Sequence, residues 1–103
     1  MADLFDRLFP TSPSETNIAV HAFMAAITDY IAGETTRNQI IAAWSLDSEA
    51  QTDLNVLCNH IDSLGTKKVD KIAFAVEFDA VMLLAAHGLK YTTKSGFKTR
   101  LGL

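Results

Sequence analysis

Apolar side chains recur at steps of three and four residues along most of the chain, which is the period of one face of an α-helix. The longest such stretch covers residues 66–88 and is apolar on two adjacent faces. One face holds Val69, Ile72, Ala73, Val76, Ala80, Leu83 and Leu84, and the other holds Phe74, Phe78, Val81, Met82 and Ala85. A helix that is apolar around most of its circumference is normally either buried or in a membrane.

Two carboxylates decide between these environments. Glu77 and Asp79 interrupt the stretch, and the remaining apolar run is shorter than the ~20 residues that cross a bilayer. Each carboxylate would also cost roughly 2.5–3.5 kcal/mol at the bilayer centre. We therefore expect residues 67–87 to form the buried central helix of a soluble domain, with no membrane partner. Thr66 is the candidate N-cap and Gly88 the candidate left-handed residue after the last turn.

The rest of the chain predicts more helices and no strands. Ser12 and Pro13 are typical of a helix start, and this helix should run to about Ala32, where Gly33 ends it. Shorter helices are expected over residues 36–46, 48–64 and 93–101. The predicted fold class is all-α, a compact bundle of about four main helices around residues 67–87, with short helices at both termini.

The segment before this bundle, DLFDRLF at residues 3–9, is rich in large apolar groups. Leu4, Phe5, Leu8 and Phe9 would lie along one side of a two-turn helix, which is marginal in water by itself. We treat residues 1–12 as an N-terminal apolar arm and residues 13–103 as a single helical domain. Two roles stay open for the arm: it caps the core of its own chain, or it docks in a groove of another protein.

Charge is distributed unevenly along the chain. Residues 1–64 contain nine acids and two bases, a net charge of −7, whereas residues 65–103 contain three acids and seven bases, a net charge of +4. Such polarity can favour contacts between the acidic part of one molecule and the basic part of another. Simple solvation of both surfaces is the alternative.

Reactive side chains are present, but their spacing does not assemble them into a site. The three histidines, His21, His60 and His87, fall on different predicted helices, so they would have to converge to bind a metal. Glu77 and Asp79 are two residues apart and point in different directions around a helix. Cys58 lies on an apolar face without a neighbouring cation, as a small core residue does. We expect no catalytic, cofactor-binding or metal-binding residue, no cofactor and no enzymatic activity.

Two segments could suggest nucleic-acid binding. Residues 35–61 contain two short predicted helices joined by a tight turn, like a helix-turn-helix, but the second helix carries acids and no lysine or arginine, which is unsuited to a polyanion. The tail is better suited, with Lys90, Lys94, Lys98 and Arg100 interleaved with Tyr91 and Phe97. It could neutralise a few phosphates or an acidic protein surface. We favour the protein partner, because the chain itself supplies an acidic half.

Three pieces of the sequence together resemble a family. They are Gly33-x-x-Thr36-x-x-Gln39-Ile40-x-x-x-Trp44-x-Leu46 followed by Asp47-Ser48-Glu49-Ala50-Gln51, then Leu83-Leu84-Ala85-Ala86-x-Gly88-Leu89, and lastly the segment from Tyr91 to Arg100-Leu101-Gly102-Leu103. Over residues 17–103 the combination resembles small helical virion-associated proteins of tailed bacteriophages. The resemblance implies a non-enzymatic virion component of the capsid, neck or tail, present in several copies.

The sequence thus predicts a structural or assembly protein that acts through protein–protein contacts. Its expected partners are other virion proteins or copies of itself, in a homo-oligomer or a larger assembly. Its expected location is the virion, assembled in the host cytoplasm, or otherwise the cytoplasm. The alternative is a small nucleic-acid-binding regulator that uses the basic C-terminal tail. The predicted protein-interaction residues are Leu4, Phe5, Leu8, Phe9, Lys94, Phe97, Lys98 and Arg100.

Overall fold

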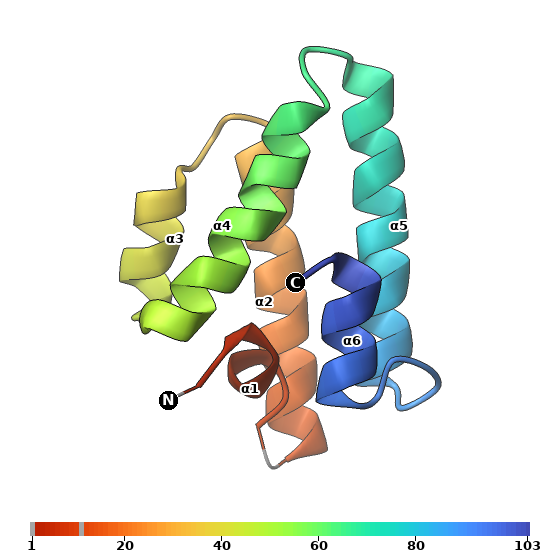
Figure 1. Cartoon of the computed structure of the whole chain (residues 1–103). Helices are drawn as coiled ribbons and strands as arrows, with labels where there is room; N and C mark the ends of the chain where they lie inside the picture. Colours follow the sequence, from red (N-terminus) through yellow and green to blue (C-terminus); the bar gives the residue numbers. More distant parts are fainter. Residues whose placement is uncertain (1, 11) are drawn as a thin grey trace.

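The computed structural model describes residues 2–10 and 12–103, and these residues form six helices and no strand. The helices are α1 (Leu4–Leu8), α2 (Pro13–Ile31), α3 (Arg37–Trp44), α4 (Ser48–Ser63), α5 (Lys68–Ala86) and α6 (Lys94–Leu101). Figure 1 shows α2 and α5 as the two long helices that run past each other in opposite directions. The all-α prediction is confirmed.

Most helix starts follow from local side-chain chemistry. Ser12, Thr36, Asp47 and Thr93 each accept a hydrogen bond from a backbone N–H in the first turn of α2, α3, α4 and α6, which satisfies a donor that the helix leaves free. The exception is α5, which begins after Lys67 without a side-chain cap. Thr66 is therefore not its N-cap, and that prediction is wrong.

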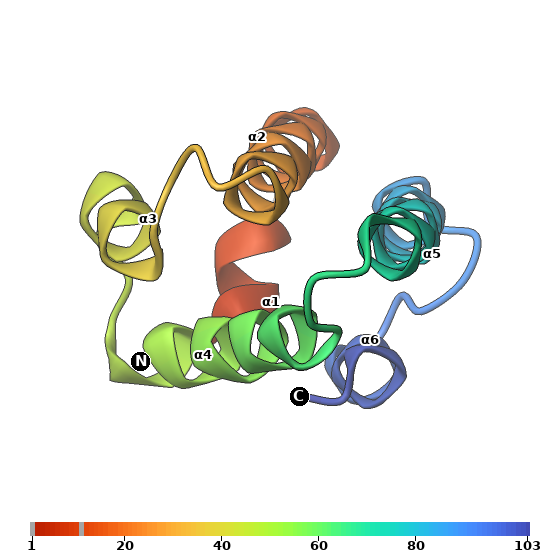
Figure 2. The same cartoon turned by 90° about the horizontal axis from the view of Figure 1, so that it is seen from above.

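The longer helices form two layers, and the short helix α1 contacts helices of both. Seen from above, α2 and α5 lie on one side and α4 and α6 on the other, with α3 at the edge (Figure 2). The short α1 contacts α2, α4 and α6. Its side chains Leu4 and Leu8 are completely buried in the same core as Phe23, Leu54 and other apolar residues of the longer helices.

The N-terminal arm therefore caps the core of its own chain in this structure. Residues 1 and 11 of the predicted arm lie outside the described residues. A five-residue helix cannot form stably in water alone, so α1 depends on its burial against its three neighbours. Asp3 also caps it by accepting a hydrogen bond from the N–H of Asp6 at 3.0 Å.

The prediction that α5 is the buried centre of the bundle is only partly confirmed. Phe78, Val81, Met82 and Ala85 of its second face are buried, but the first face is turned to solvent from Val69 to Ala80. Val69 is 77% exposed, Ile72 53% and Val76 64%. None of the helices described lies on the side of α5 that faces away from α4 and α6 (Figure 2). The chain has two apolar faces on this helix and covers one of them.

Candidate functional site

The two ends of the chain, which sequence reasoning marked as interaction segments, meet each other. The ring centroid of Phe97 lies 5.4 Å from that of Phe5 and 5.2 Å from that of Phe9, both in edge-on arrangements, and Phe5 stacks on Phe9 at 4.6 Å. Leu4, Leu8 and Phe97 have no exposed surface. These three side chains are contacts within the chain, so the prediction that they face another protein does not fit this structure.

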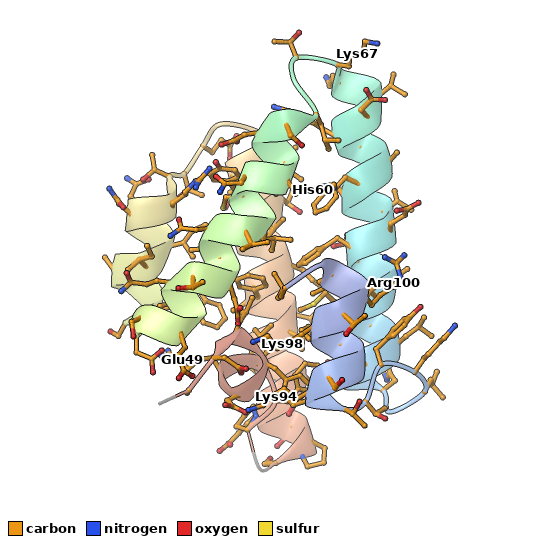
Figure 3. The ribbon with its side chains drawn as sticks, in the orientation of Figure 1. Glu49, His60, Lys67, Lys94, Lys98 and Arg100 are labelled. Carbon is orange, nitrogen blue, oxygen red and sulfur yellow. The ribbon has the colours of Figure 1, made fainter. Side chains whose placement is uncertain are left out.

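The basic residues of α6 are also used inside the molecule. The ammonium nitrogen of Lys98 lies 3.0 Å from a carboxylate oxygen of Asp3 and 3.3 Å from one of Asp53. That of Lys94 lies 2.9 Å from Asp6. Figure 3 shows both lysines beside α1. The acidic partner that the sequence suggested for the tail is thus the N-terminal half of the same chain.

Asp3 and Asp53 are nearly buried acids, which burial would penalise without partners. The carboxylate of Asp53 accepts a hydrogen bond from the N–H of Leu4 at 3.1 Å, so it holds both α1 and α6. For Asp3, burial by itself raises the pKa, but the N–H of Asp6 and the ammonium groups of Lys98 and Lys94 outweigh it and lower the pKa below its ordinary value. We call these contacts of α1, α4 and α6 the terminal junction.

The last predicted interaction residue, Arg100, lies on the other side of α6 from Lys94 and Lys98 (Figure 3). Its guanidinium lies 6.0 Å from the ring centroid of Tyr91, and the ammonium of Lys90 lies 5.2 Å from the same ring. Of the four tail cations, Lys90 and Arg100 make no ion pair among the residues described.

Next to Arg100 is a hollow of 400 Å³ between α4, α5 and α6. Its polar lining residues are His60, Glu77, Thr99 and Arg100, and Phe74 and Phe78 form part of its apolar wall. The His60 ring lies against Phe74 with the centroids 5.2 Å apart. Within the described residues no hydrogen bond orients Glu77 toward His60 or Arg100, so the hollow does not contain a positioned acid–base pair.

The remaining reactive groups are placed as structural residues. Cys58 is completely buried, and this burial raises the pKa of its thiol, so the nucleophilic thiolate is disfavoured. Beside it, Tyr30 donates a hydrogen bond to Asp62 at 2.9 Å, and Arg37 pairs with Asp62. No group of three or more histidine, cysteine or acidic side chains that could hold a metal ion occurs within residues 2–10 and 12–103.

Half of the large apolar residues that are exposed in the described structure lie instead on α5. Its outer face comprises Val69, Ile72, Ala73, Val76 and Ala80, which are all exposed. The three- and four-residue spacing of these residues is visible in the sequence, and it predicts a buried face, which the structure leaves exposed. Apolar residues at a helical period indicate a face that is buried in a contact. The period does not show whether that contact is made by the same chain or by another protein.

A groove of 580 Å³ runs beside this outer face, between α2 and the first half of α5. Thr28, Ile31 and Ala32 form its α2 wall, and Lys68, Lys71, Ile72, Ala75, Val76 and Asp79 are on the α5 wall. Burial raises the pKa of Asp79. No ion pair or hydrogen bond to the Asp79 side chain occurs among the described residues, which distinguishes it from the nearly buried Asp3 and Asp53.

Comparison with known proteins gives no match. No protein-family model matches the chain, and neither a curated protein nor a solved structure is found to be similar to it. None of the helices in the described part of the chain is long and apolar enough to cross a membrane.

Proposed function

We propose that this protein is a non-enzymatic structural or assembly module that acts by binding another protein through the outer face of α5. The resemblance in sequence supports a more specific form of the proposal, in which the module is a component of the virion of a tailed bacteriophage. The single observation that carries the proposal is the exposed apolar stripe of Val69, Ile72 and Val76.

The stripe is unusual because its members are adjacent. Single exposed apolar residues are normal on a protein surface, whereas contiguous apolar patches mark interaction sites. Val69, Ile72 and Val76 are separated by three and four residues, so they lie next to one another on one side of α5. Burying a valine or isoleucine fully contributes about 1.5–3 kcal/mol, which gives a partner helix a substantial gain from this face alone.

The alternative of a nucleic-acid-binding regulator draws less support from the tail than the sequence suggested. Lys94 and Lys98 would have to leave Asp6, Asp3 and Asp53 before they could bind phosphates. That exchange would expose or unpair nearly buried carboxylates. Lys90 and Arg100 are then the tail cations that can meet a phosphate without rearrangement, and two charges support only weak binding.

Gene context is the most direct test of the virion proposal. We expect the genes on either side of this one to encode capsid, portal or tail proteins. We also expect mass spectrometry of gradient-purified particles to detect the chain in a fixed ratio to the major capsid protein. A neighbourhood of metabolic genes, or particles without the chain, would overturn the virion assignment.

The nucleic-acid alternative has its own experiment. Retention of the chain on DNA or RNA at low salt should be absent under our proposal. Salt-sensitive retention that is lost when Lys90, Lys94, Lys98 and Arg100 are neutralised together would support the alternative instead. The matched control neutralises Lys67, Lys68 and Lys71, which changes a similar number of charges at the other end of the molecule.

A further inference from the structure

Charged residues flank the stripe on α5 in an arrangement that is complementary to itself. Lys68 lies at the start of the helix and Asp79 lies eleven residues later, and both line the groove beside α2. They are therefore on the same flank of the stripe, about 16 Å apart along the helix axis. Neither side chain makes an ion pair within the described part of the chain.

Both groups are at unfavourable positions in the isolated chain. A lysine at a helix N-terminus opposes the positive end of the helix dipole. α5 begins at Lys68 after Lys67 without a side-chain cap, and Asp70 is the one acid of its first turn. Asp79 is partly desolvated against α2 with no cation beside it, and burial raises its pKa. A partner that brought a carboxylate to the start of α5 and a cation to Asp79 would relieve both costs.

A second copy of α5, packed in the opposite direction, supplies both the carboxylate for Lys68 and the cation for Asp79. In an antiparallel pair with two-fold symmetry, flanks of the same kind lie side by side, so each contact occurs twice. With the two-fold axis midway between Ile72 and Val76, Ile72 of one copy faces Val76 of the other. Lys68 then lies one residue, about 1.5 Å of helix rise, from the level of Asp79 in the second copy.

We propose that a second copy of this chain binds the outer face of α5 in antiparallel orientation, with the Val69, Ile72 and Val76 stripes in contact and with two reciprocal Lys68–Asp79 ion pairs. This inference rests on the proposed function, because it identifies the partner of the protein-binding face. In a parallel two-fold pair the Lys68–Asp79 flank of one copy would instead lie against the opposite flank of the other copy, so the Lys68 and Asp79 side chains of the two copies would not meet.

The flat area of the face, roughly 560 Å², is of the same order as one side of a small dimer interface. A 19-residue helix such as α5 or α2 is about 28 Å long, and two adjacent helices with axes 8–10 Å apart present a face about 20 Å wide. Stable interfaces bury roughly 800 Å² on each partner. Ala32, the residue that follows α2, is exposed and lines the groove beside the stripe, and such a small side chain allows close approach of a second helix pair.

The other large exposed apolar residues do not form a comparable surface. Ile18 belongs to α2, Val56 to α4 and Leu89 to the connection between α5 and α6. Each comes from a different segment of the chain, whereas three of the six most exposed large apolar residues belong to one half of α5.

Sedimentation equilibrium of the full chain over a wide concentration range tests the inference. We expect a monomer–dimer equilibrium. Val76→Glu should abolish the dimer, while circular dichroism and thermal unfolding show that the variant is folded, because Val76 is exposed in the monomer. A wild-type chain that stays monomeric at millimolar concentration would overturn the inference.

A charge exchange tests the orientation. Lys68→Glu alone or Asp79→Lys alone places like charges opposite each other twice per dimer and should weaken dimerisation about tenfold. The double variant Lys68→Glu/Asp79→Lys restores two opposite-charge pairs and should recover most of the wild-type affinity. Lys90→Glu, at a lysine beyond the C-terminal end of α5 and far along the chain from Lys68 and Asp79, is the matched control and should change nothing. A double variant as weak as the singles would overturn the antiparallel arrangement.

Failure of this inference and failure of the proposed function give different results. A strictly monomeric chain that is found in purified particles, with Val76→Glu preventing its incorporation, would keep the protein-binding function and reject self-association. A dimer that shows the charge rescue, encoded among metabolic genes, would keep the self-association and reject the virion role.

Discussion

The terminal junction and the outer face of α5 both combine apolar side chains with charged ones. The side chains of the junction are buried and paired, whereas those of the outer face are exposed. At the junction, the apolar residues Leu4, Leu8 and Phe97 are completely buried, and the carboxylates of Asp3 and Asp53 lie against Lys98. On the outer face, Val69, Ile72 and Val76 are exposed, and Asp79 beside it makes no ion pair within the described residues. The junction is complete within one chain, whereas the outer face is open in the single chain, and we propose that a partner covers it.

An apolar segment with nearby charges can therefore be covered in two ways, by its own chain or by a second molecule. Part of the driving force of folding comes from burying such segments, and the chain does this for α1, whose five residues contact three helices. The same driving force acts on the outer face of α5 when a second molecule is present. We therefore expect substitutions in the two regions to have different effects on the folded monomer.

The largest expected effect is the loss of an aromatic ring from the junction. Phe97→Ala removes a completely buried side chain that contacts Phe5 and Phe9, so the free energy of unfolding should fall by about 3–5 kcal/mol. Urea denaturation followed by circular dichroism measures this. Leu89→Ala, at an exposed position, should change it by less than about 0.5 kcal/mol. Equal effects would mean that the two ends do not pack as described.

A smaller loss of stability is expected when a side chain of similar length replaces Lys98 and removes its charge from the junction. Lys98→Met removes the ammonium partner of Asp53 and leaves Asp3 with only the more distant Lys94, at 3.8 Å. It should reduce the free energy of unfolding by about 1–3 kcal/mol, the cost of an unsatisfied buried polar group. Lys90→Met is the matched control, because the ammonium of Lys90 lies over the Tyr91 ring and makes no ion pair among the described residues. A Lys98 variant as stable as this control would show that the ion pairs do not hold the termini together.

The two regions should respond to pH with opposite sign. The pKa of Asp3 is lowered in the folded protein, so its ionised form stabilises folding above the ordinary value of 3.8, and this stability is lost as the pH falls through the lowered pKa. Asp3→Asn should therefore be less stable than wild type at neutral pH, with the difference shrinking in acid.

Asp79 gives the contrasting case. Burial raises its pKa, so the neutral form favours folding below the ordinary aspartate value, and this contribution is lost as the pH rises through the raised pKa. At neutral pH and at concentrations where the chain is monomeric, Asp79→Asn should be at least as stable as wild type. Thermal unfolding across a pH series compares both variants, and a destabilised Asp79→Asn monomer would contradict the lack of a cation partner.

The smallest effect on the folded monomer is expected on the stripe itself. Val69→Thr keeps the size and branching of an exposed side chain, so the free energy of unfolding of the monomer should change by less than about 0.5 kcal/mol. Self-association should nevertheless weaken, because the hydroxyl group is desolvated in the dimer. Denaturation at low concentration measures the stability of the monomer, and sedimentation at high concentration measures self-association. A large loss of monomer stability would show that the outer face is part of the core.

Local pattern was sufficient for the helices and for most of their ends. Ser12 with Pro13, the capping box of Thr36 and Gln39, and the positive φ of Gly88 are formed by residues close in sequence, so they could be recognised there. The neighbours of each helix depend on residues far apart in sequence. Asp3 and Lys98 are 95 residues apart, and nothing local to either one indicates the other.

An all-α chain, the period of each helix and the two apolar faces of α5 thus follow from the amino-acid sequence alone. The folded chain is needed to show which of those faces is covered, and that the acidic N-terminus and the basic tail form ion pairs within one molecule. Helix formation and capping depend on groups within about one turn. Burial and charge pairing depend instead on the relative positions of whole helices, which are set by packing across the entire chain.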